Sequence, residues 1–379
     1  MVNKKEELVK VLYFVDRMLR GGIQSLVIDW VSRFDKNKIH VDFLLLDDGV
    51  KYELEDTLKK MGCNVYKLDG IWIKKPCDFI KQAKALDDFF KDHHDYKVVH
   101  LHSSSKNYLV LKYAEKYGIP MRISHSHNID FQTKNQIKKI IGNILKPKLI
   151  KYSTNYFACS KIAGEWLFGE SIVNSEKFEI IHNAIDYDKF KYNETTRKEM
   201  RKELNIADDE ILIGHVGRFT NQKNHSFLIE IFKGLYEKNK KYKLIMIGSG
   251  ELENSIKKKV EKLDLNKNVI FAGFQNDVNN YMQAMDLFVF PSLYEGLGLV
   301  LVEAQASGLP CFATKGTIPI DVKITDNFNF IPLNVQKWIY YIYINNLNRE
   351  KSTENKIKEN NYFIEDVCSQ LEKHYLAKK

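Results

Sequence analysis

Short apolar runs alternate with amphipathic segments along almost the whole chain. The runs are rich in Val, Ile, Leu and Phe and lack polar–apolar alternation, which is typical of strands buried on both faces of a parallel sheet. The first series of expected strands is Leu8–Val15, His40–Leu46, Asn64–Leu68, Val98–Leu101, Met121–Ser124, Tyr156–Cys159 and Glu179–Ile181. A second series is expected at Ile211–Val216, Lys243–Ile247, Val269–Ala272, Leu287–Phe290 and Pro310–Ala313.

The segments between these runs have helical spacing, for example Gln24–Phe34, Lys81–Lys91 and Asn224–Lys238. Alternation of strands and helices predicts βαβ units and an α/β, doubly wound sheet in each half of the chain. A charged stretch near residues 186–210 separates the two series. We therefore expect an N-terminal Rossmann-like domain over residues 1–190 and a second over 191–360. A final helix within 361–379 can pack back on the N-terminal domain. Two facing domains of this kind hold their site in the cleft between them, at the carboxyl ends of the strands.

Composition supports a folded, two-domain protein and narrows its class. The chain has 379 residues, of which 44% are hydrophobic and 28% charged, and a net charge of +9 that permits an anionic partner. Its five cysteines are scattered and form no Cys-x-x-Cys pair, which fits reduced thiols. No window approaches the roughly 20 apolar residues of a membrane span, so we expect a cytoplasmic protein. Nucleic-acid binding is not expected, because no aromatic–basic platform is present.

A first candidate site follows the strand that opens the second domain, in the segment Ile213–Asn224. Gly217 lets the backbone approach a ligand closely, and the helix that follows offers unpaired N–H groups. Arg218 and Lys223 add two cations beside that helix terminus. Backbone donors, a helix dipole and a guanidinium are the groups that bind a diphosphate. The alternative is a solvated basic loop.

A second candidate site lies in the segment Phe290–Pro310, where a strand, a glycine-containing loop and a helix follow one another. Glu295 and Glu303 bracket the loop and the helix, with Gly296–Gly298 beside the first of them. Glu303 falls among apolar residues, where an unpaired carboxylate is costly. It can accept hydrogen bonds from two neighbouring hydroxyls, such as those of a ribose, or pair with a cation of its own domain.

Two His-x-His pairs, His100/His102 and His125/His127, stand at the ends of expected strands. Alternate residues of a strand share a face, so either pair could ligate a metal. No Asp, Glu or Cys cluster in the sequence completes a site around either pair. We therefore expect no metal ion and no other cofactor.

Together these motifs resemble the retaining glycosyltransferases of family 4, which have the GT-B fold. The resemblance rests on Glu295-x7-Glu303 with its Pro-Ser-Leu-Tyr-Glu-Gly lead-in and on the Gly217–Asn224 loop. Further matches are Gly21-Gly22-Ile23-Gln24, Ala158-Cys159-Ser160, Ile181–Asp186, Ile247–Leu252 and Val269–Val278. Arg122–Asn128 resembles the branch that builds capsular and other exported bacterial polysaccharides. The usual Gly-Gly-x-Pro-Glu segment is replaced by Lys315–Asp321, which departs from the family pattern at that edge.

The resemblance implies a role for each matching residue. Arg218 and Lys223 would hold the diphosphate of a nucleotide-sugar donor, UDP being the expected carrier, and stabilise the departing nucleotide without a metal. Glu303 would bind the ribose, and Glu295 the donor sugar. His127 would be the active-site histidine, with its neighbour His125 as the alternative. The remaining donor-binding residues would be Gly21, Gly22, Gly217, Gly250, Gly296, Leu297, Gly298 and Leu299. Residues near the acceptor would be His102, His125 and Asn128.

The expected activity is therefore transfer of a hexosyl or N-acetylhexosaminyl group to a glycan, with retention of configuration. The expected acceptor is a polyprenyl-linked glycan. One alternative is a nucleotide-sugar 2-epimerase of the same architecture. The other alternative is a two-domain binding protein without catalytic activity.

The segment Phe131–Lys151 holds six lysines and no acidic residue, with Ile137, Ile140, Ile141, Ile144 and Leu145 at helical spacing. It either lies on the anionic inner face of the cell membrane or is a core-facing helix with a solvated basic side.

Overall fold

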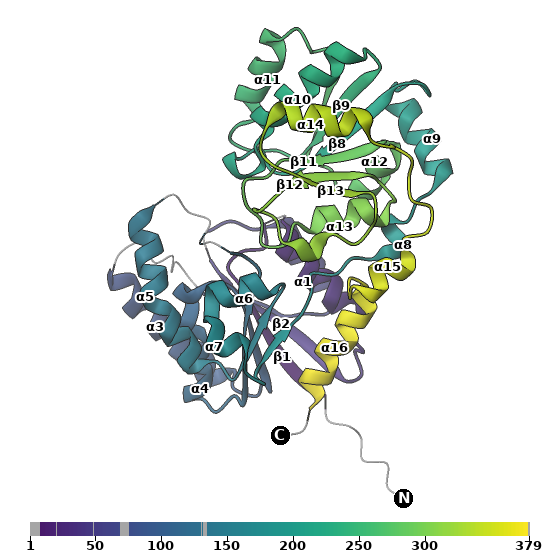
Figure 1. Ribbon diagram of the computed structural model, residues 1–379. Helices are drawn as coiled ribbons and strands as arrows, with labels where there is room; N and C mark the ends of the chain where they lie inside the picture. The colour runs from purple at the N-terminus through teal and green to yellow at the C-terminus, as the bar shows by residue number, and fades with distance from the viewer. Residues whose placement is uncertain are drawn as a thin grey trace, which may run out of the picture. The chain divides into compact units, whose positions relative to one another are not determined.

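The computed structural model describes residues 8–19, 21–47, 49–68, 76–129, 131 and 135–377. The chain divides into two compact units, each with its own sheet. Unit 1 comprises residues 1–184 and 364–379, and unit 2 comprises Ile185–Phe363 (Figure 1). None of the helices in the described ranges combines the length and the apolarity needed to cross a membrane.

The described part of unit 1 forms a seven-stranded parallel sheet in the order β3-β2-β1-β4-β5-β6-β7. Its strands are β1 (Val9–Val15), β2 (Ile39–Leu46), β3 (Val65–Leu68), β4 (Val98–His102), β5 (Met121–Ser126), β6 (Asn155–Ala158) and β7 (Phe178–Ile180). Its helices are α1 (Gly22–Arg33), α2 (Glu53–Lys60), α3 (Pro76–Asp92), α4 (Tyr108–Lys116), α5 (Gln136–Tyr152), α6 (Lys161–Phe168), α7 (Glu170–Val173) and α16 (Ile364–Leu376).

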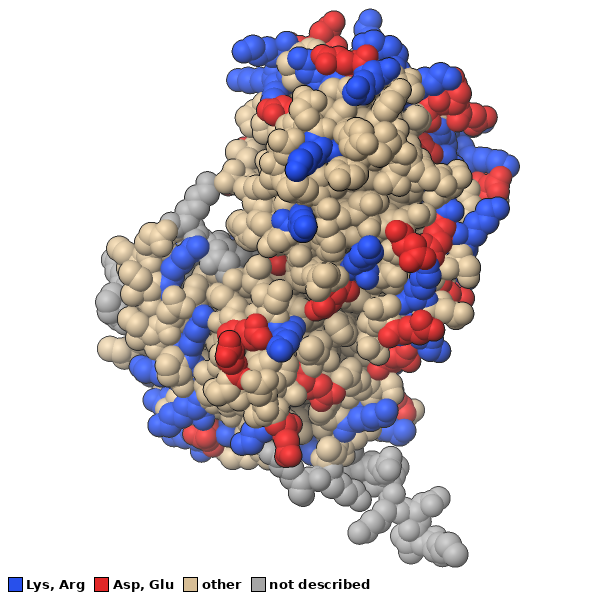
Figure 2. Space-filling model, viewed as in Figure 1, with Lys and Arg blue, Asp and Glu red and all other residues tan. Residues whose placement is uncertain are grey.

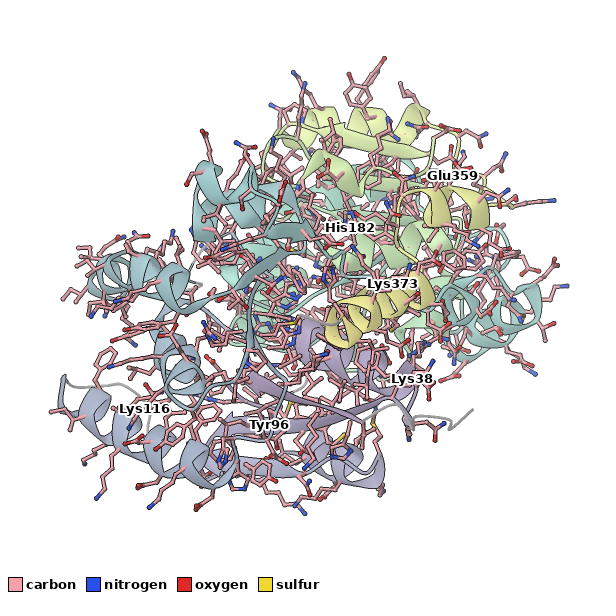
Figure 3. All side chains as sticks on the ribbon, turned by 90° about the horizontal axis from the view of Figure 1, so that it is seen from below. Lys38, Tyr96, Lys116, His182, Glu359 and Lys373 are labelled. Carbon is pink, nitrogen blue, oxygen red and sulfur yellow. The ribbon has the colours of Figure 1, made fainter. Side chains whose placement is uncertain are left out.

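The central strands of unit 1 are buried on both faces, as their apolar sequences predict. Alternate residues of β1 enter different cores: Tyr13 joins the core under α1 and α16, and Phe14 joins the core under α3 and α4. Figure 1 shows α16, in yellow, beside α1, in purple. Elsewhere in this unit Tyr96, labelled in Figure 3, donates its hydroxyl to Asp42 at 2.8 Å.

The described part of unit 2 forms a six-stranded parallel sheet in the order β10-β9-β8-β11-β12-β13. Its strands are β8 (Ile211–Val216), β9 (Tyr242–Ile247), β10 (Val269–Gly273), β11 (Leu287–Phe290), β12 (Cys311–Thr314) and β13 (Phe328–Ile331). Its helices are α8 (Tyr187–Phe190), α9 (Glu194–Glu203), α10 (His225–Lys238), α11 (Glu253–Lys262), α12 (Val278–Ala284), α13 (Leu299–Ala306), α14 (Val335–Ile344) and α15 (Glu354–Glu359).

The units divide at 184/185 and 363/364, whereas the sequence placed the boundaries at 190/191 and 360/361. The difference arises because residues 185–190 pack with unit 2, where α8 contacts α12 and α13. Gln283 Nε2 also donates to the carbonyl of Phe190 at 3.1 Å. The expected α/β architecture with two doubly wound sheets is confirmed, and each expected strand is present within two residues of its predicted ends.

Candidate active site

In unit 2 the predicted residues gather where the strand order reverses. The chain runs from β8 outward to β9 and β10, and then returns to the other side of β8 as β11. Loops that leave neighbouring strands in opposite directions create a ligand site at the carboxyl edge of such a sheet. The loop 217–224 follows β8 and the loop 291–298 follows β11, so both predicted motifs stand at this point.

Besides the Lys223–Glu295 contact, three hydrogen bonds join these two loops to each other. The backbone N–H of Leu293 donates to the carbonyl of Gln222 at 2.8 Å, and Gln222 Nε2 donates to the carbonyl of Tyr294 at 2.9 Å. Asn224 Nδ2 donates to the carbonyl of Pro291 at 3.2 Å. Segments about 70 residues apart in the sequence are therefore held as one surface.

The centre of this surface is an ion pair between Lys223 and Glu295. Lys223 Nζ lies 2.6 Å from Glu295 Oε1, and the two side chains are only 16% and 8% exposed. The same ammonium lies 4.5 Å from the centroid of the Phe290 ring, so the aromatic face also contacts the cation. Both charges are withdrawn from water and oriented before any ligand arrives.

Arg218 differs from Lys223 in its surroundings. Its side chain is exposed, and in the described ranges it makes no ion pair. A guanidinium presents a planar set of donors that suits phosphate oxygens. The loop therefore combines one cation that is already paired with one that is available to an anionic ligand.

Close backbone packing fixes the shape of the loop after β8. A Cβ at Gly248, which has φ of +135°, would lie 2.2 Å from the carbonyl oxygen of Gly217. A Cβ at Gly250 would lie 2.7 Å from the carbonyl oxygen of Phe219. Gly250 thus supports the loop from the neighbouring β9 connection, which is a packing role in addition to the predicted donor role.

The second predicted motif forms a glycine-capped helix start. Gly298 is the N-cap residue of α13, with φ of +83°, and no side chain caps the N–H groups of the helix. Leu297 is 2% exposed, so its side chain packs in the interior and only its backbone can face a ligand. Leu299, in the first turn, and Glu303, in the second, are half-buried. Gly296 lies half-buried beside the buried Glu295.

Two histidines beneath the loop were not among the predicted site residues. His215 on β8 donates its Nδ1–H to the carbonyl of Val289 at 2.8 Å, and the ring of His225 stacks on that of Phe219 with the ring centroids 4.0 Å apart. Burial lowers the pKa of His215 to about 4 and that of His225 to about 2. His215 stood inside a recognised motif, but nothing in the sequence showed that its side chain turns beneath the loop.

These two histidines predict that the protein loses stability in mild acid. At pH 5 the unfolded chain protonates both imidazoles, whose ordinary pKa is about 6.5, while the folded chain keeps them neutral. The unfolded state then binds more protons, so the free energy of unfolding falls as the pH falls below about 6.5. Each histidine contributes at most about 1.4 kcal/mol per pH unit. Urea unfolding from pH 7.5 to pH 5 measures this slope, which should be smaller in His225→Leu; an unchanged slope would contradict the assignment.

In unit 1 the predicted residues stand at the carboxyl ends of three adjacent strands. Gly21 and Gly22 follow β1 at the start of α1, His102 ends β4, and His127 follows β5. Gly21 is the N-cap residue of α1, in an extended conformation and without a side-chain cap. The structure therefore places these residues at the same edge of the sheet.

His127 is held on both sides by hydrogen bonds. Its Nδ1 lies 3.1 Å from Oδ1 of Asn183, and its Nε2 lies 3.0 Å from Nδ1 of His102. Burial lowers the pKa of His127 to about 4, so the ring is neutral at pH 7. Asn183, which follows the His182 labelled in Figure 3, was not a predicted site residue. Asn183 stands inside the matching segment Ile181–Asp186, but nothing in the sequence shows that its side chain reaches His127.

The other two predicted residues near the acceptor differ from each other. His125 is 1% exposed and stacks on Trp30, with ring centroids 5.8 Å apart. Asn128 is half-buried, and its carbonyl accepts a hydrogen bond from Ser126 Oγ at 3.2 Å. His125 is therefore a side chain of the interior, and Asn128 has the more accessible one.

Two family models match the chain, one in each half. Residues 20–189 match the model described as Glycosyltransferase Family 4, and residues 196–362 match the model described as Glycosyl transferases group 1.

Curated relatives and solved structures agree with these matches. EpsF of Bacillus subtilis, named as a glycosyltransferase, is 33% identical over 304 residues, covering 80% of this chain and 78% of that protein. An Escherichia coli UDP-Gal:α-D-GlcNAc-diphosphoundecaprenol α-1,3-galactosyltransferase is 31% identical over 244 residues, covering 62% of each. CapH of Staphylococcus aureus, a capsular polysaccharide biosynthesis glycosyltransferase, is 27% identical over 79% of each chain. The structure of Anabaena HepE with UDP and glucose matches with a TM-score of 0.71 at 18% identity, covering 97% of this chain and 95% of that one.

Proposed function

The chain belongs to the family 4, group 1 glycosyltransferases, and from that premise we propose that it transfers a sugar with retention from a UDP-sugar to a glycan acceptor. The transferred group is a hexosyl or N-acetylhexosaminyl residue. The product belongs to a capsular, exopolysaccharide or other cell-surface polysaccharide, the class named for relatives such as CapH.

One observation carries the donor assignment: two cations stand at the β8/β11 edge of unit 2, one paired with Glu295 and one available. Breaking the bond at the anomeric carbon leaves negative charge on the diphosphate. Lys223 and Arg218 stabilise that charge, and because the Lys223–Glu295 pair already fixes the ammonium, little reorganisation is needed as the charge develops. The uncapped N–H groups of α13 add a positive dipole end at the same edge.

Glu303 supplies the contact with the nucleoside. We expect Glu303→Ala to weaken UDP binding by about 10- to 100-fold, because hydrogen bonds to a charged group contribute roughly 1.5–3 kcal/mol. Isothermal titration with UDP measures the change. Glu237→Ala, on the exposed surface of α10, is the matched control and should bind UDP as the wild type does. Equal affinities in both variants would remove Glu303 from the site.

We further propose that transfer requires no Mg²⁺ or Mn²⁺ on the diphosphate, because Arg218 and Lys223 supply the positive charge. Adding either ion to the assay should change the rate less than twofold. A strict requirement for one of them would contradict this part of the proposal.

The acceptor is proposed to be lipid-linked, and α5 is proposed to hold the enzyme on an anionic phospholipid surface. Lys134 and its two preceding neighbours lie outside the described residues, but α5 itself is described throughout. Four isoleucines of α5 point outward rather than into the core, being 43–68% exposed: Ile137, Ile140, Ile141 and Ile144. The core-facing side of this helix is instead formed by Gly142, Leu145 and Leu149.

An apolar stripe flanked by lysines is the pattern of a helix that lies in a lipid headgroup layer. Figure 2 shows blue side chains among tan surface over α5, and the helix contains no acidic residue. The alternative from the sequence is a core-facing helix with a solvated basic side; α5 does pack on the core through Gly142, Leu145 and Leu149, but its four exposed isoleucines are not part of that contact.

This surface predicts lipid binding that depends on the charge of both partners. Replacing Lys138, Lys148 and Lys151 by Gln should reduce partitioning onto phosphatidylglycerol-containing vesicles by about 100-fold, since each lysine contributes about 1 kcal/mol. Vesicle co-sedimentation measures the effect, with Lys257→Gln and Lys258→Gln on α11 of unit 2 as the control. Undiminished binding of the triple variant would exclude α5 as the anchor.

Product analysis tests the activity itself. UDP-sugars are incubated with the enzyme and a polyprenyl-diphosphate-linked saccharide, and the linkage is read by NMR; retention predicts an α-linked product from an α-linked donor. A β-linked product would exclude retention. Conversion of the donor to its C2 epimer without acceptor would instead identify the 2-epimerase alternative, and UDP binding without either reaction would identify a binding protein.

A further inference from the structure

The four histidines of the two His-x-His pairs lie together inside unit 1. His100 pairs with Ile123 in the register of the neighbouring strands β4 and β5, so the two pairs meet on one face of the sheet. They are between 0 and 7% exposed. Neither pair alone has enough ligands for a metal site. Because β4 and β5 are neighbours, His125 of the second pair lies beside His100 and His102 of the first and can be the third ligand.

We propose that His100, His102 and His125 bind a divalent transition-metal ion, with Zn²⁺ as the natural occupant. One ring nitrogen from each of the three lies within 4.8 Å of the others. His100 Nε2 and His125 Nδ1 lie 3.1 Å apart and share a hydrogen bond, which coordination of both nitrogens to the metal would replace. Nitrogen ligands around tetrahedral zinc stand about 3.3 Å apart, given bonds of about 2.0–2.1 Å. Two of the three ligands therefore have the required spacing, and the nitrogen of His102 lies within 4.8 Å of both.

His102 provides the second observation. Its Nε2 is buried and has no hydrogen-bond partner among the residues that the structure describes, although the side chain is only 4% exposed. An unpartnered polar atom in an interior is costly, and a metal ion satisfies a nitrogen lone pair there.

In His100 and His102 the nitrogen that would not bind the metal, Nδ1, already has a hydrogen-bond partner. Histidines that bind a metal usually have such a partner for their second nitrogen. The Tyr375 hydroxyl lies 2.7 Å from Nδ1 of His100, and the Tyr13 hydroxyl lies 2.7 Å from that of Tyr375. Nδ1 of His102 lies 3.0 Å from Nε2 of His127. If each Nδ1 carries the proton and donates it, the Nε2 lone pairs of His100 and His102 both turn toward the metal.

The ligand set also selects the metal. Three imidazole nitrogens suit zinc and its transition-metal neighbours, whereas Mg²⁺ and Ca²⁺ take oxygen ligands. A three-histidine site leaves a fourth position for water.

The site would position His127. A metal on Nε2 of His102 fixes the proton on Nδ1, which then donates to Nε2 of His127, and this leaves Nδ1–H of His127 to donate to Asn183. Only this consequence for transfer rests on the proposed function; metal binding does not.

Metal content and binding of the full chain test the proposal. The wild type, expressed in zinc-supplemented medium and purified without chelator, should contain about one zinc per chain by mass spectrometry. Refolding with Co²⁺ should give the visible absorption of a tetrahedral site. His102→Gln and, independently, His125→Gln should each lose at least 90% of the metal, while the control His93→Gln, at the residue that follows α3, keeps it.

Two results would overturn the proposal: a wild type that contains no zinc and shows no Co²⁺ spectrum, or variants that bind metal as the wild type does. The wild-type measurements need no variant to fold. UDP binding by the same preparations, measured by calorimetry, reports on unit 2 separately, so a failure of the metal site is distinguishable from a failure of the proposed function.

Discussion

Replacing Lys223 by Met is expected to lower kcat/KM for sugar transfer by about 100- to 1,000-fold, the usual cost of removing one group that stabilises transition-state charge. Lys223 Nζ lies 2.6 Å from Glu295 and faces the ring of Phe290. The ammonium therefore occupies a fixed position at the β8/β11 edge of unit 2. Steady-state kinetics with the native donor measure the effect.

The same substitution should also destabilise the protein, because it leaves the carboxylate of Glu295 buried without its partner. Breaking a buried pair from one side costs about 3–5 kcal/mol. Combining Lys223→Met with Glu295→Gln should recover much of that stability without recovering activity. Lys233→Met, which removes an exposed partner of Glu237 on α10, is the control and should change neither property. Full activity in Lys223→Met would exclude the lysine from catalysis.

Replacing Arg218 by Met is expected to lower kcat/KM by a similar factor, about 100-fold, with almost no change in stability. The side chain is exposed and makes no ion pair with the described residues, so its removal breaks no ion pair among them. We expect the loss of activity because the guanidinium is proposed to bind the diphosphate of the donor.

Comparison of Arg218→Met with Arg218→Lys gives the discriminating result. Lysine keeps the positive charge of arginine but lacks its planar set of donors. If the charge dominates, Arg218→Lys should be clearly more active than Arg218→Met. If bidentate binding of the phosphate dominates, the two variants should be similarly inactive. Loss of activity accompanied by an equal loss of thermal stability would indicate a structural role and contradict the assignment.

The sequence predicted the sheets because buried parallel strands are continuous apolar runs. It did not predict β13, since Phe328–Ile331 reads Phe-Asn-Phe-Ile and pairs at the edge of its sheet. Glycines and cations beside strand ends located both loops of the unit 2 site. The roles of the residues in these loops come from the resemblance to the family, and they remain proposals.

The contacts between those loops could not be predicted from local patterns. Lys223 and Glu295 are 72 residues apart, and their 2.6 Å contact depends on β8 and β11 being neighbours. The histidines show the same limit: His102 and His127 are 25 residues apart, and Tyr375 reaches His100 from the last helix of the chain. Helical spacing likewise grouped the isoleucines of α5 with Leu145, although the helix turns them to solvent.

Thermal unfolding with and without UDP tests the central claim most directly, because a ligand of the folded state raises the unfolding temperature by mass action. At a UDP concentration of about 100 times Kd the wild type should gain roughly 2.7 kcal/mol of stability. The double variant Arg218→Met/Lys223→Met should gain almost none, and Lys233→Met should gain as much as the wild type. Equal stabilisation of the double variant by UDP would contradict a donor site formed by Arg218 and Lys223.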